Sequence, residues 1–175
     1  MKYIEAPNEY QYGSQSLATS IFLAGSITNA KDWQKILYAS IKNANGVVYN
    51  PRRENFDINN PKDSRIQIEW EFDYLRKADI IVFYFSGETV APITLYELGA
   101  ALERNVSRDR RKQQKILIYC EPEYSRKFDV KVQTELMIRK CYGDEADYPT
   151  KKFATVYEDY DKFIHNLLEL IISGE

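Results

Sequence analysis

The chain has 175 residues, 44% of them hydrophobic and 29% charged, which is typical of one soluble globular domain. Acidic residues outnumber basic residues by 26 to 24, so no overall positive field is available to hold a nucleic acid polymer. A single His and two isolated Cys residues, Cys120 and Cys141, argue against a metal centre and a disulfide framework. We therefore expect neither a metal nor a cofactor.

The sequence shows no signal peptide and no apolar run long enough to span a bilayer. We accordingly predict a cytoplasmic protein without a membrane partner. The one strongly basic run, Arg104–Lys115, lies between a helical pattern and an apolar run, so we interpret it as a solvated loop.

Apolar β-rich runs alternate with helical patterns, which is typical of a parallel sheet covered by helices on both faces. Residues 1–17 are polar and aromatic and are left as an N-terminal extension without an assigned element. The predicted strands are Ser20–Ala24, Gly46–Asn50, Asp79–Phe85, Lys115–Cys120 and Phe153–Tyr157. The predicted helices are Ala30–Asn43, Ser64–Ala78, Pro92–Asn105, Val130–Arg139 and Glu158–Ile172.

This order of elements predicts a single α/β domain over residues 1–175, with a flavodoxin-like doubly wound sheet of five parallel strands in the order 2-1-3-4-5. Ligands of such sheets bind beyond the carboxyl ends of the strands, near the switch between the first and third strands. The residues that follow those strand ends are Gly25–Asn29, Asn50–Asn55 and Ser86–Glu97.

The first of these loops contains Gly25, which permits a tight turn, and Asn29, which we predict to cap the next helix together with Asp32. Free N–H groups at such a helix start can hold an anion or a sugar hydroxyl, but an ordinary turn explains the pattern equally well. Neither a dinucleotide fingerprint nor a P-loop motif is present in the sequence.

The second predicted helix directs a carboxylate toward apolar residues. On a helical wheel, Glu71 falls within a face formed by Ile68, Trp70, Phe72, Tyr74, Leu75 and Ala78. A carboxylate in a core is costly unless it is paired or functional, so we favour a catalytic role over a buried structural pair.

Glu97 lies on a helix that is apolar on nearly all sides. Pro92 suits the first helical position, and Ala91 before it is expected to be extended. The apolar residues on the two sides of the helix are Leu95, Leu98 and Leu102, and Ile93, Ala100 and Ala101. Such a helix is expected to be buried on both sides, and we expect one of the two sides to be buried at a subunit interface. Glu97 is then either catalytic or paired across that interface.

Two carboxylates at one cleft suit the transfer of a glycosyl group. One can stabilise the positive charge that develops on the sugar and capture it covalently, while the other manages the proton of the departing base. Arg52 and Arg53, which end the second strand, can bind a phosphate, a base carbonyl or a carboxylate. They can equally pair with Glu54, Asp57 or a neighbouring subunit.

These stretches together resemble the nucleoside 2-deoxyribosyltransferase superfamily, in particular its deoxyribosyltransferase-like branch. The similar segments are IFLAGSI at Ile21–Ile27 followed by Trp33, NPRR at Asn50–Arg53, IEWEFDYLRKADIIVFYF at Ile68–Phe85 and APITLYELGAAL at Ala91–Leu102. The ELG within a helix after an apolar strand is the most specific of them.

The resemblance implies that Glu97 is the nucleophile and that Glu71 handles the base or a sugar hydroxyl. Asp129 lies near the position where family members place a residue that reaches the neighbouring subunit's site, so the resemblance also implies a homo-oligomer with shared sites. Together, the loops and motifs give a set of expected substrate-binding residues: Phe22, Gly25, Ser26, Trp33, Asn50, Arg52, Arg53, Thr94 and Asp129.

Two positions depart from the family pattern. Phe22 stands where many members have a tyrosine that orients the nucleophile, unless Tyr84 or Tyr96 replaces it. Ala91, six residues before Glu97, stands where members have an acid or a phosphate-binding serine.

Three hypotheses follow for a protein that binds a small nucleoside or nucleotide. The first is 2-deoxyribosyl transfer between bases through a covalent Glu97 intermediate. The second is hydrolysis of the N-glycosidic bond of a deoxynucleoside 5'-monophosphate, and the third is a catalytically inactive nucleotide-binding or sensing protein.

Overall fold

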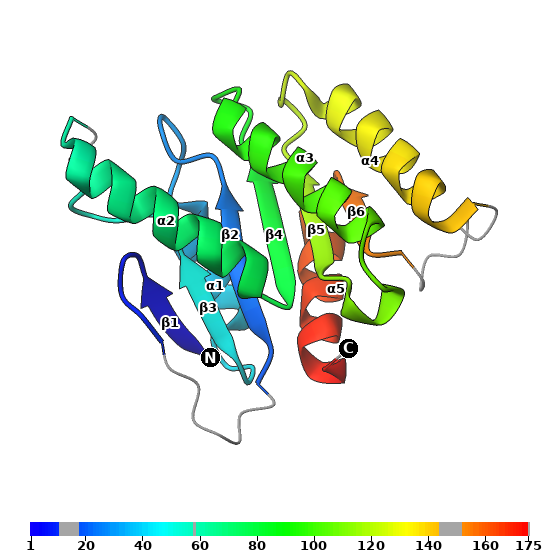
Figure 1. Ribbon diagram of the computed structural model, residues 1–175, viewed down its shortest axis with the longest axis horizontal. Coiled ribbons are helices and arrows are strands. Elements are labelled where there is room, and N and C mark those ends of the chain that lie inside the picture. The colour runs from blue at the N-terminus through cyan, green and yellow to red at the C-terminus, as the bar shows by residue number, and fades with distance from the viewer. Residues whose placement is uncertain (11–17, 58, 144–151, 175) are drawn as a thin grey trace.

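The computed structural model describes residues 1–10, 18–57, 59–143 and 152–174, which form an α/β fold around a parallel sheet of six strands (Figure 1). The strands are β1 (Lys2–Glu5), β2 (Ser20–Gly25), β3 (Val47–Asn50), β4 (Ile80–Phe85), β5 (Lys115–Cys120) and β6 (Ala154–Tyr157). The helices are α1 (Trp33–Ile41), α2 (Pro61–Lys77), α3 (Pro92–Val106), α4 (Lys127–Tyr142) and α5 (Tyr160–Ser173), with a short 3-10 helix, η1 (Arg110–Lys112).

The strand order is β1-β3-β2-β4-β5-β6, so the expected five strands stand in the expected order but the predicted strand count is wrong. The additional strand, β1, pairs in parallel with β3, with Lys2 opposite Val47 and Glu5 opposite Asn50. It comes from the segment that we left unassigned, because a half-exposed edge strand with only Ile4 buried lacks the apolar run of a central strand. Residues 11–17 of the expected extension lie outside the described residues.

The helices cover the two faces of the sheet, as the alternating pattern predicts. Helices α2, α3 and α4 lie on one face, and α1 and α5 lie on the other (Figure 1). Every residue of β4 is buried because this strand is central and covered on both sides, which explains its uninterrupted apolar sequence, Ile80–Phe85. The site-bearing helices α2 and α3 therefore sit on the same face, on either side of the β2–β4 pair.

The helix ends differ from the predictions by up to three residues, and helix α4 extends three residues further at each end. Asp32, not Asn29, caps α1 and accepts a hydrogen bond from the Lys35 N–H, while Asn29 adopts a left-handed conformation with φ 56°. Helix α2 begins earlier than expected because the Asn60 side chain caps it and Pro61 occupies its first position.

The buried face of α2 is narrower than the helical wheel predicts. Trp70, Tyr74 and Leu75 pack on the sheet, but Ile68 and Phe72 are 62% and 55% exposed, so the prediction that they are buried is wrong. Glu71 consequently lies at the border between the packed face and an exposed apolar face. In the described ranges, no helix combines the length and the apolar content that crossing a membrane requires.

Candidate functional site

A cavity of about 270 Å³ opens beyond the carboxyl ends of β2 and β4, with α2 on one side and the start of α3 on the other. This is where the topology of a doubly wound sheet places ligands, and the volume is near the lower end for small-molecule sites. Its lining residues are Phe22, Ala24, Gly25, Ser26, Ile27, Thr28, Pro51, Glu71, Thr89, Ala91, Pro92, Ile93, Thr94 and Glu97.

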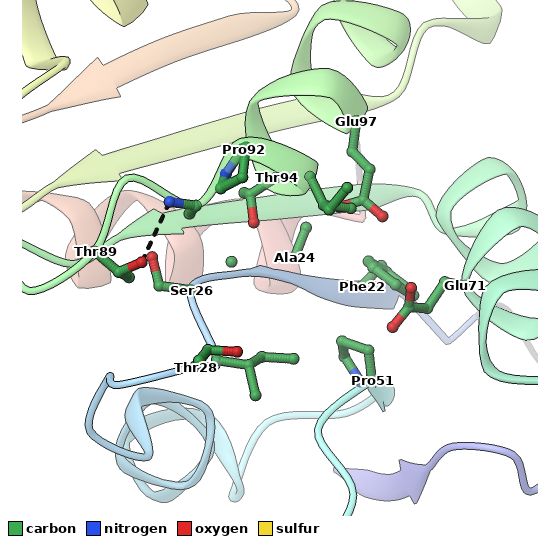
Figure 2. Close-up of a pocket in the computed structure, with 14 residues that line it drawn as sticks. Phe22, Ala24, Ser26, Thr28, Pro51, Glu71, Thr89, Pro92, Thr94 and Glu97 are labelled. Atoms are coloured by element: carbon green, nitrogen blue, oxygen red, sulfur yellow. Dashed lines mark hydrogen bonds between the residues drawn. The ribbon is translucent and has the colours of Figure 1, made fainter. Parts of the chain in front are cut away.

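The two carboxyl groups that the sequence singled out meet in this cavity. Figure 2 shows Glu97 directed down from α3 and Glu71 directed in from α2, with the ring of Phe22 beside them. The hydroxyl groups of Ser26, Thr28 and Thr89 gather at the other end of the cavity (Figure 2). The cavity therefore has an acidic end and a neutral polar end.

Glu97 is the more strongly perturbed of the two acids. Burial, together with the nearby charge of Glu71, raises the pKa of Glu97 from 4.5 to about 8. Within the described residues, no hydrogen-bond donor and no cation offsets these effects. The Glu97 carboxyl thus holds its proton at neutral pH.

Glu71 has a partner that favours its ionised form. Burial raises the pKa of Glu71 above its ordinary value, but the side-chain amide of Gln67 donates a 2.7 Å hydrogen bond to Glu71 Oε1 and opposes this rise. The same amide nitrogen donates to the Pro51 carbonyl at 2.7 Å, which fixes Gln67 between α2 and the end of β3. Gln67 was not predicted, because a Gln one turn from an acid is a common pattern in surface helices.

The neutral end of the cavity is built from the backbone turns after β2 and β4. The Ser26 N–H donates to the Tyr84 carbonyl at 3.0 Å, and the Ser26 hydroxyl accepts from the Ser86 N–H at 3.2 Å. Ala91 is left-handed, with φ 48°, rather than extended as predicted, and its N–H donates to the Thr89 hydroxyl at 3.4 Å. A left-handed non-glycine residue at the start of α3 stores strain beside the cavity.

Six of the predicted site residues line the cavity, and five do not. Those in the lining are Phe22, Gly25, Ser26, Glu71, Thr94 and Glu97; those outside it are Trp33, Asn50, Arg52, Arg53 and Asp129. Neither Tyr84 nor Tyr96 supplies the hydroxyl that Phe22 lacks. The Tyr84 hydroxyl donates to Glu121, and Tyr96 is 76% exposed and lies outside the cavity lining.

Trp33 does not line the cavity but holds in place the turn that carries Ser26. Its indole is buried, and its N–H donates to the Ser26 carbonyl at 2.8 Å. Gly25 is needed for this arrangement, because a Cβ atom at that position would lie 2.5 Å from the Trp33 ring.

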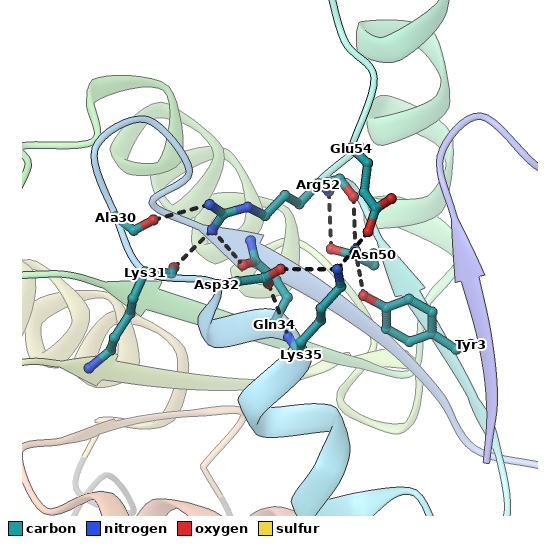
Figure 3. A network of polar contacts seen from close by, with 9 residues as sticks. All are labelled: Tyr3, Ala30, Lys31, Asp32, Gln34, Lys35, Asn50, Arg52 and Glu54. Atoms are coloured by element: carbon teal, nitrogen blue, oxygen red, sulfur yellow. Dashed lines mark hydrogen bonds and ion pairs between the residues drawn. The ribbon is translucent and has the colours of Figure 1, made fainter.

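Arg52 is occupied by the chain itself (Figure 3). Its guanidinium donates to the carbonyls of Ala30 and Lys31 at 3.1 and 2.8 Å, and to the Gln34 side chain at 3.4 Å. These bonds tie the end of β3 to the start of α1, so the donors expected to grip a ligand serve the fold in this structure.

The other three residues outside the lining also have local environments of their own. Asn50 is buried and bonded to Tyr3 and to the Arg52 backbone. Arg53 lies over the Phe56 ring, and its Nη1 has no hydrogen-bond partner within the described ranges. Asp129 is exposed in the first turn of α4, 3.7 Å from the Arg126 guanidinium.

Comparison with known proteins identifies the family. The sequence profile described as nucleoside 2-deoxyribosyltransferase like matches residues 18–124, which is more than half of the chain. The chain belongs to this family, and that membership supports nucleoside glycosyl chemistry as the general class of function.

The solved structures add support for the fold alone. A conserved protein from Enterococcus faecalis V583 is similar with a TM-score of 0.51 at 16% identity, over 89% of this chain and 98% of that chain. A search of curated proteins found no match.

The raised pKa of Glu97 predicts a pH-dependent cost to stability. The unfolded chain loses this proton near pH 4.5 and the folded chain near pH 8, so stability falls as the pH rises between these values. Relative to the wild type, Glu97→Gln should therefore gain roughly 1–3 kcal/mol at pH 8.5 compared with pH 5. Urea unfolding at both pH values measures the difference. Glu103→Gln, an exposed change on the same helix, is the control, and an equal gain in both variants would contradict the assignment.

Proposed function

We propose that this protein transfers 2-deoxyribose between bases of small nucleosides, with Glu97 as the nucleophile and Glu71 as the acid–base group. The observation that supports this most is the meeting of the two carboxyls, from α2 and α3, at one end of a single cavity. Membership of the nucleoside 2-deoxyribosyltransferase-like family makes a nucleoside the expected occupant.

The reaction needs only these two acids. The pair holds one proton, which passes from Glu97 to Glu71 as the nucleoside reacts. A Glu97 carboxylate oxygen attacks the anomeric carbon of the sugar while the bond from that carbon to the base nitrogen breaks, and the departing base takes this proton from Glu71. A second base then attacks the same carbon, gives its proton to Glu71 and frees Glu97. A 2-deoxy sugar ionises easily because it lacks the electron-withdrawing 2-hydroxyl.

The electrostatics of the pair fit a transition state that carries positive charge. Before charge develops on the sugar, the proton resides on Glu97, where burial and the Glu71 charge hold it. Positive charge developing on the sugar beside Glu97 favours the Glu97 anion and lowers its pKa. The cavity is thereby more complementary to the charged transition state than to the neutral nucleoside.

The charge of the lining favours a nucleoside over a nucleotide. In the described part of the chain, none of the lining residues is Lys, Arg or His, and two are carboxylic acids. The Arg52 guanidinium, expected to seat a phosphate, is bonded to backbone carbonyls. A phosphate would have to bind at the neutral end of the cavity, which is formed by Ser26–Thr28 and Thr89. For this reason we place the transferase ahead of the nucleotide hydrolase.

Turnover assays distinguish the three hypotheses. Deoxynucleosides and their 5'-monophosphates are incubated with the protein, with and without a free acceptor base, and the bases are followed by chromatography. We expect base exchange with deoxynucleosides that requires the acceptor, and a loss of about 10³-fold or more in Glu97→Gln, because the covalent step cannot occur.

Glu103→Gln is the matched control and should retain activity. Free base released only from monophosphates would replace the proposal with the hydrolase. Nucleotide binding without turnover would replace it with the inactive sensing protein, for which Phe22 and Ala91 are the supporting residues.

We also propose that a second copy of the chain covers the outer faces of α2 and α3. Ile68 and Phe72 on α2, and Ile93 and Tyr96 on α3, expose between 55% and 76% of their surface. Ile93 also lines the cavity, so a copy seated on α3 would border the site. Exposed apolar side chains on adjacent helices are typical of an interface, which supports an oligomer with shared sites.

The oligomer proposal predicts that charges on this face separate the subunits. Ile68→Lys combined with Tyr96→Lys should sediment as a monomer where the wild type sediments as a dimer or larger species, because buried lysines would be unpaired. Analytical ultracentrifugation measures this. Ile172→Lys, 80% exposed on α5 across the sheet, should have no effect. A monomeric wild type at all concentrations would refute the proposal.

A further inference from the structure

Glu121, which directly follows β5, gathers four donors around one carboxylate. Its Oε1 accepts from Lys31 Nζ and from the Tyr84 hydroxyl, each at 2.6 Å. Its Oε2 accepts from the Gly87 N–H at 2.9 Å and from the Ser86 hydroxyl at 3.1 Å. Glu121 is not part of the cavity lining and has no part in the chemistry proposed above.

The four donors come from the two turns that build the neutral end of the cavity and from strand β4, which holds Tyr84. Lys31 closes the turn after β2, which carries Ser26 and Thr28, and Gly87 lies in the turn after β4, which carries Thr89. The two turns also meet directly, through the bond from the Ser86 N–H to the Ser26 hydroxyl. Glu121 thus links the turns after β2 and β4 while lying outside the cavity lining.

The contacts of Tyr84 extend this link to Trp33, which lies outside the cavity lining. The Tyr84 ring stacks on Trp33, with ring centroids 4.6 Å apart and an interplanar angle of 8°. Trp33 in turn donates to the Ser26 carbonyl. A displacement of the Glu121 carboxylate is therefore expected to reach Ser26 by two routes, through Ser86 and through the Tyr84–Trp33 stack.

The charge of Glu121 makes this link strong. The side chain is only 14% exposed, and charge-assisted hydrogen bonds are about twice as strong as neutral ones. Burial alone would raise the pKa of Glu121, but the hydrogen bonds from Lys31, Tyr84 and the Gly87 N–H outweigh it and lower the pKa to about 2. The carboxylate remains ionised at any pH at which the protein would work.

We propose that Glu121 is a positioning residue that holds the turns after β2 and β4 at the separation required to bind the part of the substrate remote from the reacting bond. This inference rests on the proposed function for the identity of the substrate. Its structural part, the link between the two turns, does not depend on turnover.

Amide hydrogen exchange tests the link directly. Glu121→Gln keeps the size of the side chain but removes its charge, so the amides of Ser26–Thr28 and Gly87–Ala91 should exchange at least about fivefold faster than in the wild type. Amides in α5 should not change. The matched control is Glu158→Gln, which removes a glutamate that follows β6 and is paired with Lys127 and Lys131. Unchanged exchange in both turns, or the same acceleration in the control, would overturn the proposal.

Kinetics test the functional consequence. Because Glu71 and Glu97 lie at the opposite end of the cavity, Glu121→Gln should raise KM for the deoxynucleoside about tenfold and change kcat less than twofold. Tyr84→Phe, which removes one of the four donors, should show a smaller rise in KM. A kcat loss with an unchanged KM would refute the positioning role, while a wild type without turnover would refute the proposed function and leave the exchange result to judge Glu121.

Discussion

The partial burial of two acids in one cavity is the constraint on which the rest of this site depends. Burial and the charge of Glu71 together hold a proton on Glu97 at neutral pH, with no donor or cation in the described residues to release it. Such an arrangement costs stability and is seldom retained in a core that only needs to pack. It becomes favourable when positive charge develops between the acids, as it does during transfer of a sugar.

The fold brings the acids together through its topology. Helices α2 and α3 precede and follow β4, and both lie on the same face of the sheet, so one residue from each reaches the carboxyl end of the β2–β4 pair. Around this acidic end, Gln67 orients Glu71, and Trp33 and Glu121 fix the turns of the neutral end. The two acids lie on helices, and the turns that complete the cavity are held by the hydrogen bonds of Trp33 and Glu121.

The five strands β2 to β6, their order and the two acids follow from patterns that are local in sequence, such as alternation, helical spacing and the ELG motif. Edge strand β1 was not predicted because it is half exposed and lacks an apolar run. Ile68 was predicted to be buried because a helical wheel does not show where the packed face ends and solvent begins. Arg52 and Glu121 depend on partners 18 to 90 residues away, the longest separation being that of Lys31 from Glu121, so their roles required the tertiary structure. The local signals located the two acids and predicted a class of chemistry, whereas the contacts that support them could not be predicted from sequence.

The most direct test is the titration of Glu97 by carboxyl-carbon NMR in the wild type and in Glu71→Gln. Burial, together with repulsion from Glu71 in a shared cavity, predicts a pKa of about 8 for Glu97 in the wild type. In Glu71→Gln the pKa should fall, though not to 4.5, because the effect of burial persists. A wild-type pKa near 4.5, or one that does not change when Glu71 is neutralised, would show that the two carboxyls do not share the cavity and would contradict the account.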